Sequence, residues 1–296
     1  MLDKLNAGIA YNAFFYAFKD YIPNLELIND SRDVKKYDLI IFPGGEDINP
    51  RMYYEENMYS SYNNNRDDIE SEIFDEASHF GKKMLGVCRG HQLINAKLGG
   101  RLVQDILFCG YPPHRGGHNL RYHSSNSLTK YIVGDNKVNS MHHQGVIYNG
   151  KNLNATSSFE NIIESSESSN IYSVQFHPEF MGGELGLRFF ETIALWVLDR
   201  DKLLKLIVEE KNKQVKQDAN TSSTTSNYSS TTSTSDWTIR LNPEVLERME
   251  RAREEINRRT NINVHELVED DFTNNDEELH DEDFIEDGEE FDDEDN

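Results

Sequence analysis

The first 200 residues alternate between the apolar periods of helices and those of short strands. Three phenylalanines within residues 8–22 recur at helical spacing, which predicts a helix with an aromatic face. An apolar run at 25–28 predicts a short strand, and the continuous apolar run at 37–42 predicts a buried strand that ends at a Pro-Gly-Gly turn. The chain is therefore expected to open with a helix that is followed by core strands.

The helical period returns at 67–80, where two aspartates near the start suit the positive end of a helix. A strand at 83–87 then runs without a pause into a helix at 88–96. Further strands are predicted at 101–107, 136–140, 152–156, 161–165 and 171–176, and a further helix at 182–198. This order predicts an α/β fold, a mainly parallel open sheet with helices on both faces.

The pattern changes beyond residue 200, so residues 1–200 are expected to form the folded domain. Residues 201–217 read as a charged helix, and residues 218–236 are a linker rich in Ser and Thr. Residues 237–296 are expected to hold a short helix, at 243–259, and a disordered acidic tail.

The formal net charge of −23 is concentrated at the end of the chain. Residues 262–296 hold 18 of the 53 acidic residues and no Lys or Arg, so the rest is only mildly acidic. Neither part offers a basic surface for nucleic acid. No apolar stretch approaches the roughly 20 residues that span a bilayer. Two cysteines make no disulfide framework, and no signal peptide is evident, so a cytoplasmic location is expected.

The strongest chemical motif is Gly-x-Cys-x-Gly at 86–90, between the predicted strand and helix. A nucleophile on such a sharp turn is exposed above the sheet edge, and the flanking glycines let neighbouring chains approach. The positive end of the following helix favours a thiolate at Cys88. A buried structural cysteine is the alternative for this motif alone.

Three further polar segments follow predicted strands. A Phe-Pro-Gly-Gly turn at 42–45 can supply an oxyanion donor. In the His-Pro-Glu run at 177–179, the carboxylate can orient the imidazole toward Cys88, as in a catalytic triad. A polar cluster occupies 139–144. Open α/β sheets place their sites at the carboxyl ends of strands, so these segments are expected to meet there.

The run GVCRGHQ at 86–92, with FPGG before it and FHPE after it, resembles the class I glutamine amidotransferase-like superfamily. PGGEDINPRMYY, the Arg66-Asp67-x-x-Glu70 stretch, GVCRGHQLINAKLGG and NSMHHQ are most similar to its γ-glutamyl-γ-aminobutyrate hydrolase branch. The similarity covers about residues 5–198. That family opens with a full strand, whereas here few residues precede the predicted helix. The first strand is therefore expected to be short, missing or replaced.

The resemblance implies that residues 1–200 are a catalytic domain that cleaves γ-glutamyl amides through a thioester. Cys88 would be the nucleophile, His177 the general base and Glu179 its partner. The backbone amides of Gly45 and Arg89 would form the oxyanion hole. The resemblance implies these substrate-binding residues: Gln92, Ser140, Met141 and His142. A structural role is the alternative for His142, and the resemblance implies no metal or organic cofactor.

Two other functions stay open at this point. The domain could be a glutaminase that delivers ammonia to a separate synthase, because residues 200–296 are too few for a second catalytic domain. It could also be an inactive scaffold whose acidic tail binds a basic protein. Acidic runs are more often solvating than specific, and an intact triad argues against inactivity. A small γ-glutamyl molecule is therefore the expected ligand.

Overall fold

The computed structural model describes residues 1–221, with side-chain burial given through residue 213. The predicted helix at 243–259, the acidic tail and most of the predicted linker lie outside the described residues. Within 1–221, no helix is both long enough and apolar enough to cross a membrane.

Five parallel strands form one half of the main sheet, in the order β2-β1-β3-β4-β12. They are β1 (Ala7–Ile9), β2 (Leu25–Leu27), β3 (Leu39–Phe42), β4 (Lys83–Val87) and β12 (Ile171–Val174). The apolar runs of β1, β3, β4 and β12 are buried on both faces, as is typical of strands covered by helices on either side, whereas the edge strand β2 is exposed at Glu26 and Leu27. The predicted parallel sheet is confirmed in this half.

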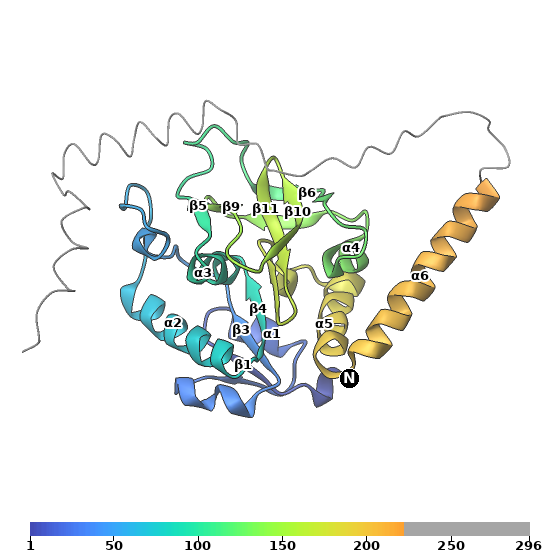
Figure 1. Ribbon diagram of the computed structural model, residues 1–296, viewed down its shortest axis with the longest axis horizontal. Coiled ribbons are helices and arrows are strands. Elements are labelled where there is room, and N and C mark those ends of the chain that lie inside the picture. Colours follow the sequence, from blue (N-terminus) through green and yellow to red (C-terminus); the bar gives the residue numbers. More distant parts are fainter. Residues whose placement is uncertain (222–296) are drawn as a thin grey trace, which may run out of the picture. The chain divides into compact units, whose positions relative to one another are not determined.

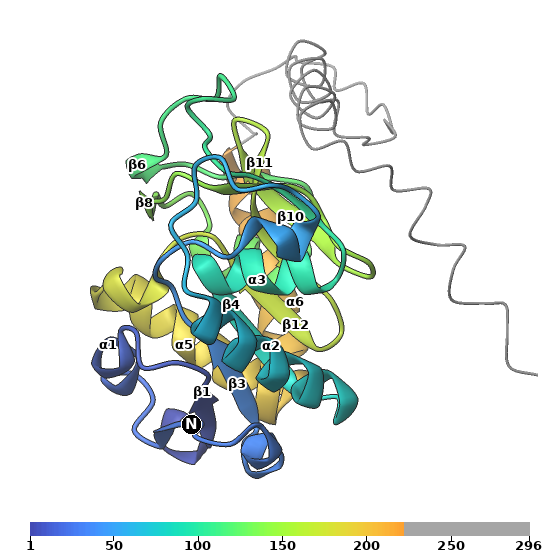
Figure 2. The same ribbon diagram turned by 90° about the vertical axis from the view of Figure 1, so that its left-hand side faces the viewer.

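The other half of the sheet is antiparallel and continues from β12. It contains β11 (Ile162–Glu167), β10 (Asn154–Phe159), β9 (Gly145–Tyr148), β7 (Arg121–Tyr122) and β5 (Arg101–Val103). A separate antiparallel pair, β6 (Arg115–His118) with β8 (Val138–Met141), is set apart from it (Figure 2). The sequence pattern did not predict β6, β7 or β9.

Helices cover both faces of the sheet (Figure 1). On one face lie α2 (Asn64–His79) and α3 (Arg89–Lys97); the other carries α1 (Phe15–Lys19), α4 (Leu128–Val133), α5 (Gly183–Leu198) and α6 (Arg200–Thr221). Short 3-10 turns lie at Leu2–Lys4, Ser31–Lys36, Pro50–Tyr53 and Pro178–Phe180. Alternate residues of β3 enter the two resulting apolar cores: Leu39 and Ile41 face α5, whereas Ile40 and Phe42 face α2.

The predicted helix at 8–22 is wrong over most of its length. Residues Ala7–Ile9 form the short first strand instead, because they pair in parallel with β2 and β3. Phe14 then adopts φ 57°, a left-handed conformation that a continuous helix excludes, and only Phe15–Lys19 are helical. At the other end, the predicted charged helix continues to Thr221, four residues into the predicted linker.

Candidate active site

Cys88 occupies a strained turn between β4 and α3. Its backbone has φ 52° and ψ −104°, outside the regions that L-residues prefer. A Cβ on Gly90 would lie 1.9 Å from the Phe42 carbonyl oxygen, and one on Gly86 would lie 2.7 Å from the Gly90 oxygen. The two glycines are therefore required for α3 to start this close to β3 and β4, as the motif predicts.

His177 and Glu179 follow β12, the strand that pairs in parallel with β4. The pairing Val87↔Val174 brings the ends of the two strands level, so the His177 imidazole comes near enough to Cys88 for the cysteine to raise its pKa. The ring nitrogen Nδ1 of His177 lies 2.7 Å from Glu179 Oε1. The structure thus brings the three predicted triad residues together in the order nucleophile, base and orienting carboxylate.

The imidazole of His177 is held from several sides. The Asn139 side chain donates to the His177 carbonyl and accepts from the His177 amide, each at 2.8 Å. Phe14 meets the ring edge-on, with centroids 5.7 Å apart. A Cβ on Gly44 would lie 2.7 Å from Cε1 of His177, so glycine is needed there. The expected motif at 139–144 thus contributes Asn139 as a positioning residue that sequence reasoning did not single out.

The pKa of His177 reflects these neighbours. Burial disfavours the imidazolium, but the hydrogen bonds and negative charges of Cys88 and Glu179 outweigh it and raise the pKa to about 10. His177 is therefore protonated at neutral pH, with the imidazolium beside the Cys88 side chain.

The two predicted oxyanion donors lie on either side of Cys88. Arg89 is the first residue of α3, so its amide is one of those that have no acceptor within the helix. Gly45 follows β3 with φ 145°, and a Cβ there would lie 2.2 Å from Arg66 Nη1. Glycine is therefore required at 45. An oxyanion role for both amides stays a prediction.

A buried ionic network supports this region. We call it the arginine cluster: Glu46, Arg66, Asp67, Glu70 and Arg89. Arg89 pairs with Asp67 and Glu70, while Arg66 pairs with Glu46 and Glu70. The Arg66 guanidinium also donates to the carbonyls of Pro43 and Gly44, at 3.3 and 2.8 Å. The cluster thus fixes the Pro-Gly-Gly turn. In the sequence, the charged residues at 66, 67 and 70, spaced i, i+1 and i+4, indicate that these side chains lie close together on a helix.

The predicted substrate-binding residues divide into two groups. Gln92 is buried, and its Nε2 donates to the Gln144 carbonyl at 3.3 Å and to Gln175 Oε1 at 3.2 Å. His142 Nδ1 meets the same carbonyl at 2.7 Å. By contrast, the Ser140 hydroxyl donates to the His114 carbonyl at 2.7 Å, and Met141 is 68% exposed. Gln92 and His142 thus converge on one carbonyl, whereas direct substrate contacts by any of the four stay a prediction.

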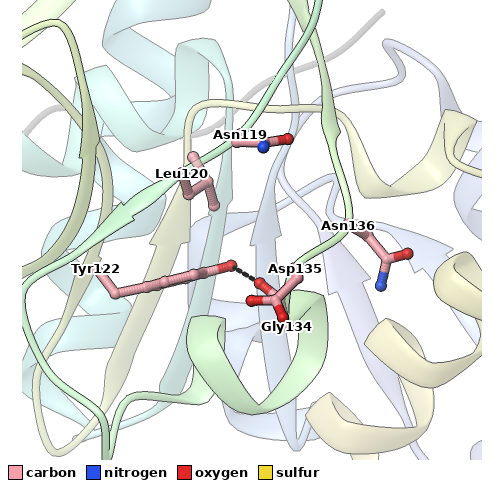
Figure 3. Close-up of a pocket in the computed structure, with 6 residues that line it drawn as sticks. All are labelled: Asn119, Leu120, Tyr122, Gly134, Asp135 and Asn136. Carbon is pink, nitrogen blue, oxygen red and sulfur yellow. Dashed lines mark hydrogen bonds between the residues drawn. The ribbon is translucent and has the colours of Figure 1, made fainter. Parts of the chain in front are cut away.

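The pocket in Figure 3 lies apart from these residues. It has a volume of about 240 Å³ and is lined by Asn119, Leu120, Tyr122, Gly134, Asp135 and Asn136. The Tyr122 hydroxyl donates to the Gly134 carbonyl at 2.6 Å within it. It contains none of the triad or predicted substrate-binding residues. The predicted nucleophile, the predicted base and the strained turn instead coincide at Cys88.

Known proteins resemble this chain over the same region. The sequence profile of the peptidase C26 family matches residues 22–179, more than half of the chain. Protein NtpR of Enterococcus hirae is 32% identical over 165 residues, 49% of this chain and 68% of NtpR. A Schizosaccharomyces pombe protein, provisionally named a glutamine amidotransferase, is 35% identical over 158 residues, 48% of this chain and 62% of that protein.

A solved structure supports the fold assignment. The crystal structure of a Thermoplasma acidophilum protein, described provisionally as part of a GMP synthase, superposes with a TM-score of 0.50 at 15% identity. The match covers 71% of this chain and 97% of that chain, and it is a likeness of fold.

Proposed function

Because the chain belongs to the peptidase C26 family, we propose that it is a cysteine hydrolase that cleaves γ-glutamyl amides. The observation that carries the proposal is the contact of His177 with both Cys88 and Glu179 at a strained strand-to-helix turn. The resemblance of the motifs to the γ-glutamyl-γ-aminobutyrate hydrolase branch supports the choice of substrate.

The first half-reaction forms a thioester. The Cys88 thiolate attacks the γ-carbonyl carbon, and the amides of Gly45 and Arg89 donate to the developing oxyanion. The imidazolium of His177, protonated because of its raised pKa, gives its proton to the departing nitrogen. The C–N bond breaks, the amine leaves, and the γ-glutamyl group remains on Cys88 with His177 neutral.

The second half-reaction releases glutamate. Neutral His177 takes a proton from a water molecule, which attacks the thioester carbonyl. The C–S bond breaks, so the Cys88 thiolate and the His177 imidazolium are restored. Glu179 keeps the imidazole in position through both halves, since its carboxylate accepts from Nδ1 at 2.7 Å.

The test is glutamate release by the purified chain from γ-glutamyl-γ-aminobutyrate, other γ-glutamyl amines and glutamine. Cys88→Ala should lower kcat/KM by about 10⁴-fold or more, and His177→Ala by several orders of magnitude. Glu179→Gln should cost less, because the amide can still orient the ring. Cys109→Ala is the matched control and should keep full activity. Equal loss in both cysteine variants would refute the assignment of Cys88.

A second candidate keeps the same chemistry for another purpose. The name of the fission yeast relative favours a glutaminase that passes ammonia from glutamine to a separate synthase. In that case the isolated chain would act on glutamine alone, and only after a second protein is added. Activity of the isolated chain on γ-glutamyl amines decides for the hydrolase. No activity on any substrate, with Cys88 unreactive toward a glutamine-like electrophile, would leave the inactive scaffold.

A further inference from the structure

Three histidines and a glutamate meet beneath the β6–β8 pair. We call this group the histidine cluster: His114, His118, His142 and Glu164. His114 and His118 come from the start and end of the β6 region, His142 follows β8, and Glu164 belongs to β11 of the main sheet. The Glu164 and His114 side chains have no exposed surface, and those of His142 and His118 are only 3% and 8% exposed. The cluster is therefore shielded from solvent.

The nitrogen and oxygen atoms of this cluster are spaced like the ligands of one metal ion. His114 Nδ1 lies 3.3 Å from His142 Nε2 and 3.1 Å from Glu164 Oε1, and the last two atoms are 3.5 Å apart. A tetrahedral zinc ion, with bonds of about 2.0–2.2 Å, separates its ligand atoms by about 3.3 Å. His118 Nε2 lies 3.8 Å from the second carboxylate oxygen, outside the three atoms that could share one ion.

The outer contact of His142 sets the tautomer that a metal needs. Its Nδ1 lies 2.7 Å from the Gln144 carbonyl oxygen, which can only accept, so Nδ1 carries the proton. The lone pair on Nε2 therefore points into the cluster. A ligating histidine typically donates its other N–H to such a carbonyl or carboxylate.

Several buried polar atoms of the cluster have no partner among the described residues. They are Nε2 of His114, both ring nitrogens of His118, and Oε2 of Glu164. Buried polar atoms without hydrogen bonds are costly, and a buried carboxylate costs more unless a positive charge compensates it.

We propose that His114, His142 and Glu164 bind one divalent transition-metal ion of the zinc type. Imidazole and carboxylate ligands suit zinc. The ion would fasten the β6–β8 pair to β11 and so hold the segment at 138–144 in place. It takes no part in the hydrolytic steps.

The same contacts connect this ion to the site of the proposed function. The Gln144 carbonyl that orients His142 also accepts from Gln92 Nε2. Loss of the ion would free His142 and with it this carbonyl. This consequence rests on the proposed function, whereas the metal site itself does not, so metal binding and hydrolysis are tested separately.

The decisive experiment measures metal binding directly. The Cys88→Ala chain, which removes the active-site thiol as a competing ligand, is stripped with a chelator and titrated with Zn²⁺ and Co²⁺. We expect one ion per chain, visible Co²⁺ bands of a four-coordinate site without thiolate charge transfer, and a melting temperature raised by about 5 °C or more at saturation. Less than one ion per chain, or a Co²⁺ spectrum with thiolate bands, overturns the proposal.

Ligand assignment uses variants in the same background. His114→Ala and Glu164→Gln should each weaken Zn²⁺ binding by about 100-fold or more. The matched control is His143→Ala, since His143 is adjacent to His142 in sequence but pairs with Asp47 at 2.9 Å instead. It should bind Zn²⁺ as the parent does. Equal Zn²⁺ affinity in all three variants would show that Glu164 is compensated by a protonated histidine and that any metal binds elsewhere.

Discussion

The arginine cluster and the histidine cluster are both buried groups of charged and polar side chains. They differ in how their charges are compensated. In the arginine cluster, two guanidiniums face three carboxylates in direct ion pairs. In the histidine cluster, one carboxylate faces three imidazoles, and four polar atoms have no partner within the described chain. The carboxylates of the first group pair with guanidiniums, whereas the carboxylate of the second has only imidazole partners and is a proposed ligand of a cation.

The difference teaches how to separate a positioning network from a ligand site. Both groups are buried, and both connect distant segments, so burial does not distinguish them. What distinguishes them is the number of donors and acceptors left over, because proteins seldom bury a polar atom without a partner. Even in the arginine cluster Arg89 Nε is left over, but each charged side chain has an ion-pair partner.

The largest expected effect comes from breaking the compensated cluster. Glu70 is fully buried and pairs with both arginines, so Glu70→Gln removes a buried ion pair from each of them. The free energy of unfolding should fall by about 3–5 kcal/mol. Urea denaturation measures this fall. The matched control on the same helix is Asp75→Asn, which breaks the exposed pair with Lys97 and should cost about 1 kcal/mol or less. Equal losses would mean that the cluster contributes no more than a surface pair.

The next effect is a stabilisation by zinc, which should depend on the histidine cluster and not on the arginine cluster. At a free Zn²⁺ concentration about 100 times the dissociation constant, the wild-type chain should gain about 2.7 kcal/mol of unfolding free energy. Glu164→Gln should lose that gain, and in the metal-free chain it should cost less than Glu70→Gln, because Glu164 pairs with no Arg or Lys among the described residues. Denaturation with zinc and with chelator measures both quantities. A Glu70→Gln loss that zinc abolishes would contradict the separation.

The two clusters also differ in what the sequence revealed. The arginine cluster takes three of its members from one helix, so the charged spacing at 66–70 is visible in the sequence. The histidine cluster draws on three segments that fold together only through β6, β8 and β11. Two of its members lie in a Gly-rich stretch at 110–118 with no apolar period, where no strand was predicted.

The other differences between the predicted and the observed elements have the same physical origin. The approach of the three predicted triad residues could be predicted because each follows a buried strand, and parallel pairing brings strand ends level. The strand at Ala7–Ile9 was missed because three residues are too few to show a strand pattern against the helical spacing of the phenylalanines that follow. Pairing with the two neighbouring strands decides their conformation. Pairing partners are a property of the fold and leave no local pattern.

A smaller effect concerns His177, an imidazole that pairs with one carboxylate, Glu179. Its pKa is raised to about 10 from an ordinary value of 6.5, so this pairing stabilises the fold fully below pH 6.5 and loses its effect as pH rises through 10. Glu179→Gln should lower that pKa. The stability difference between wild type and variant should therefore be largest near pH 6 and shrink toward pH 10. Urea denaturation at several pH values tests the sign, and a difference that grows with pH would refute it.

The smallest expected effect is that of ending the chain at Thr221. The triad and both clusters lie before residue 180, and the last core contacts described are those of Leu203 and Ile207 in α6. Removing residues 222–296 should therefore leave kcat/KM and zinc content within about twofold of the full chain, as a linker composition at 218–236 also suggests. Ending the chain at Asp199 is the matched control, because it uncovers the core beneath α6 and should lower the melting temperature by several degrees. A folded but inactive Thr221 truncation would show that residues 222–296 complete the site, and the predicted helix at 243–259 would be the first segment to restore.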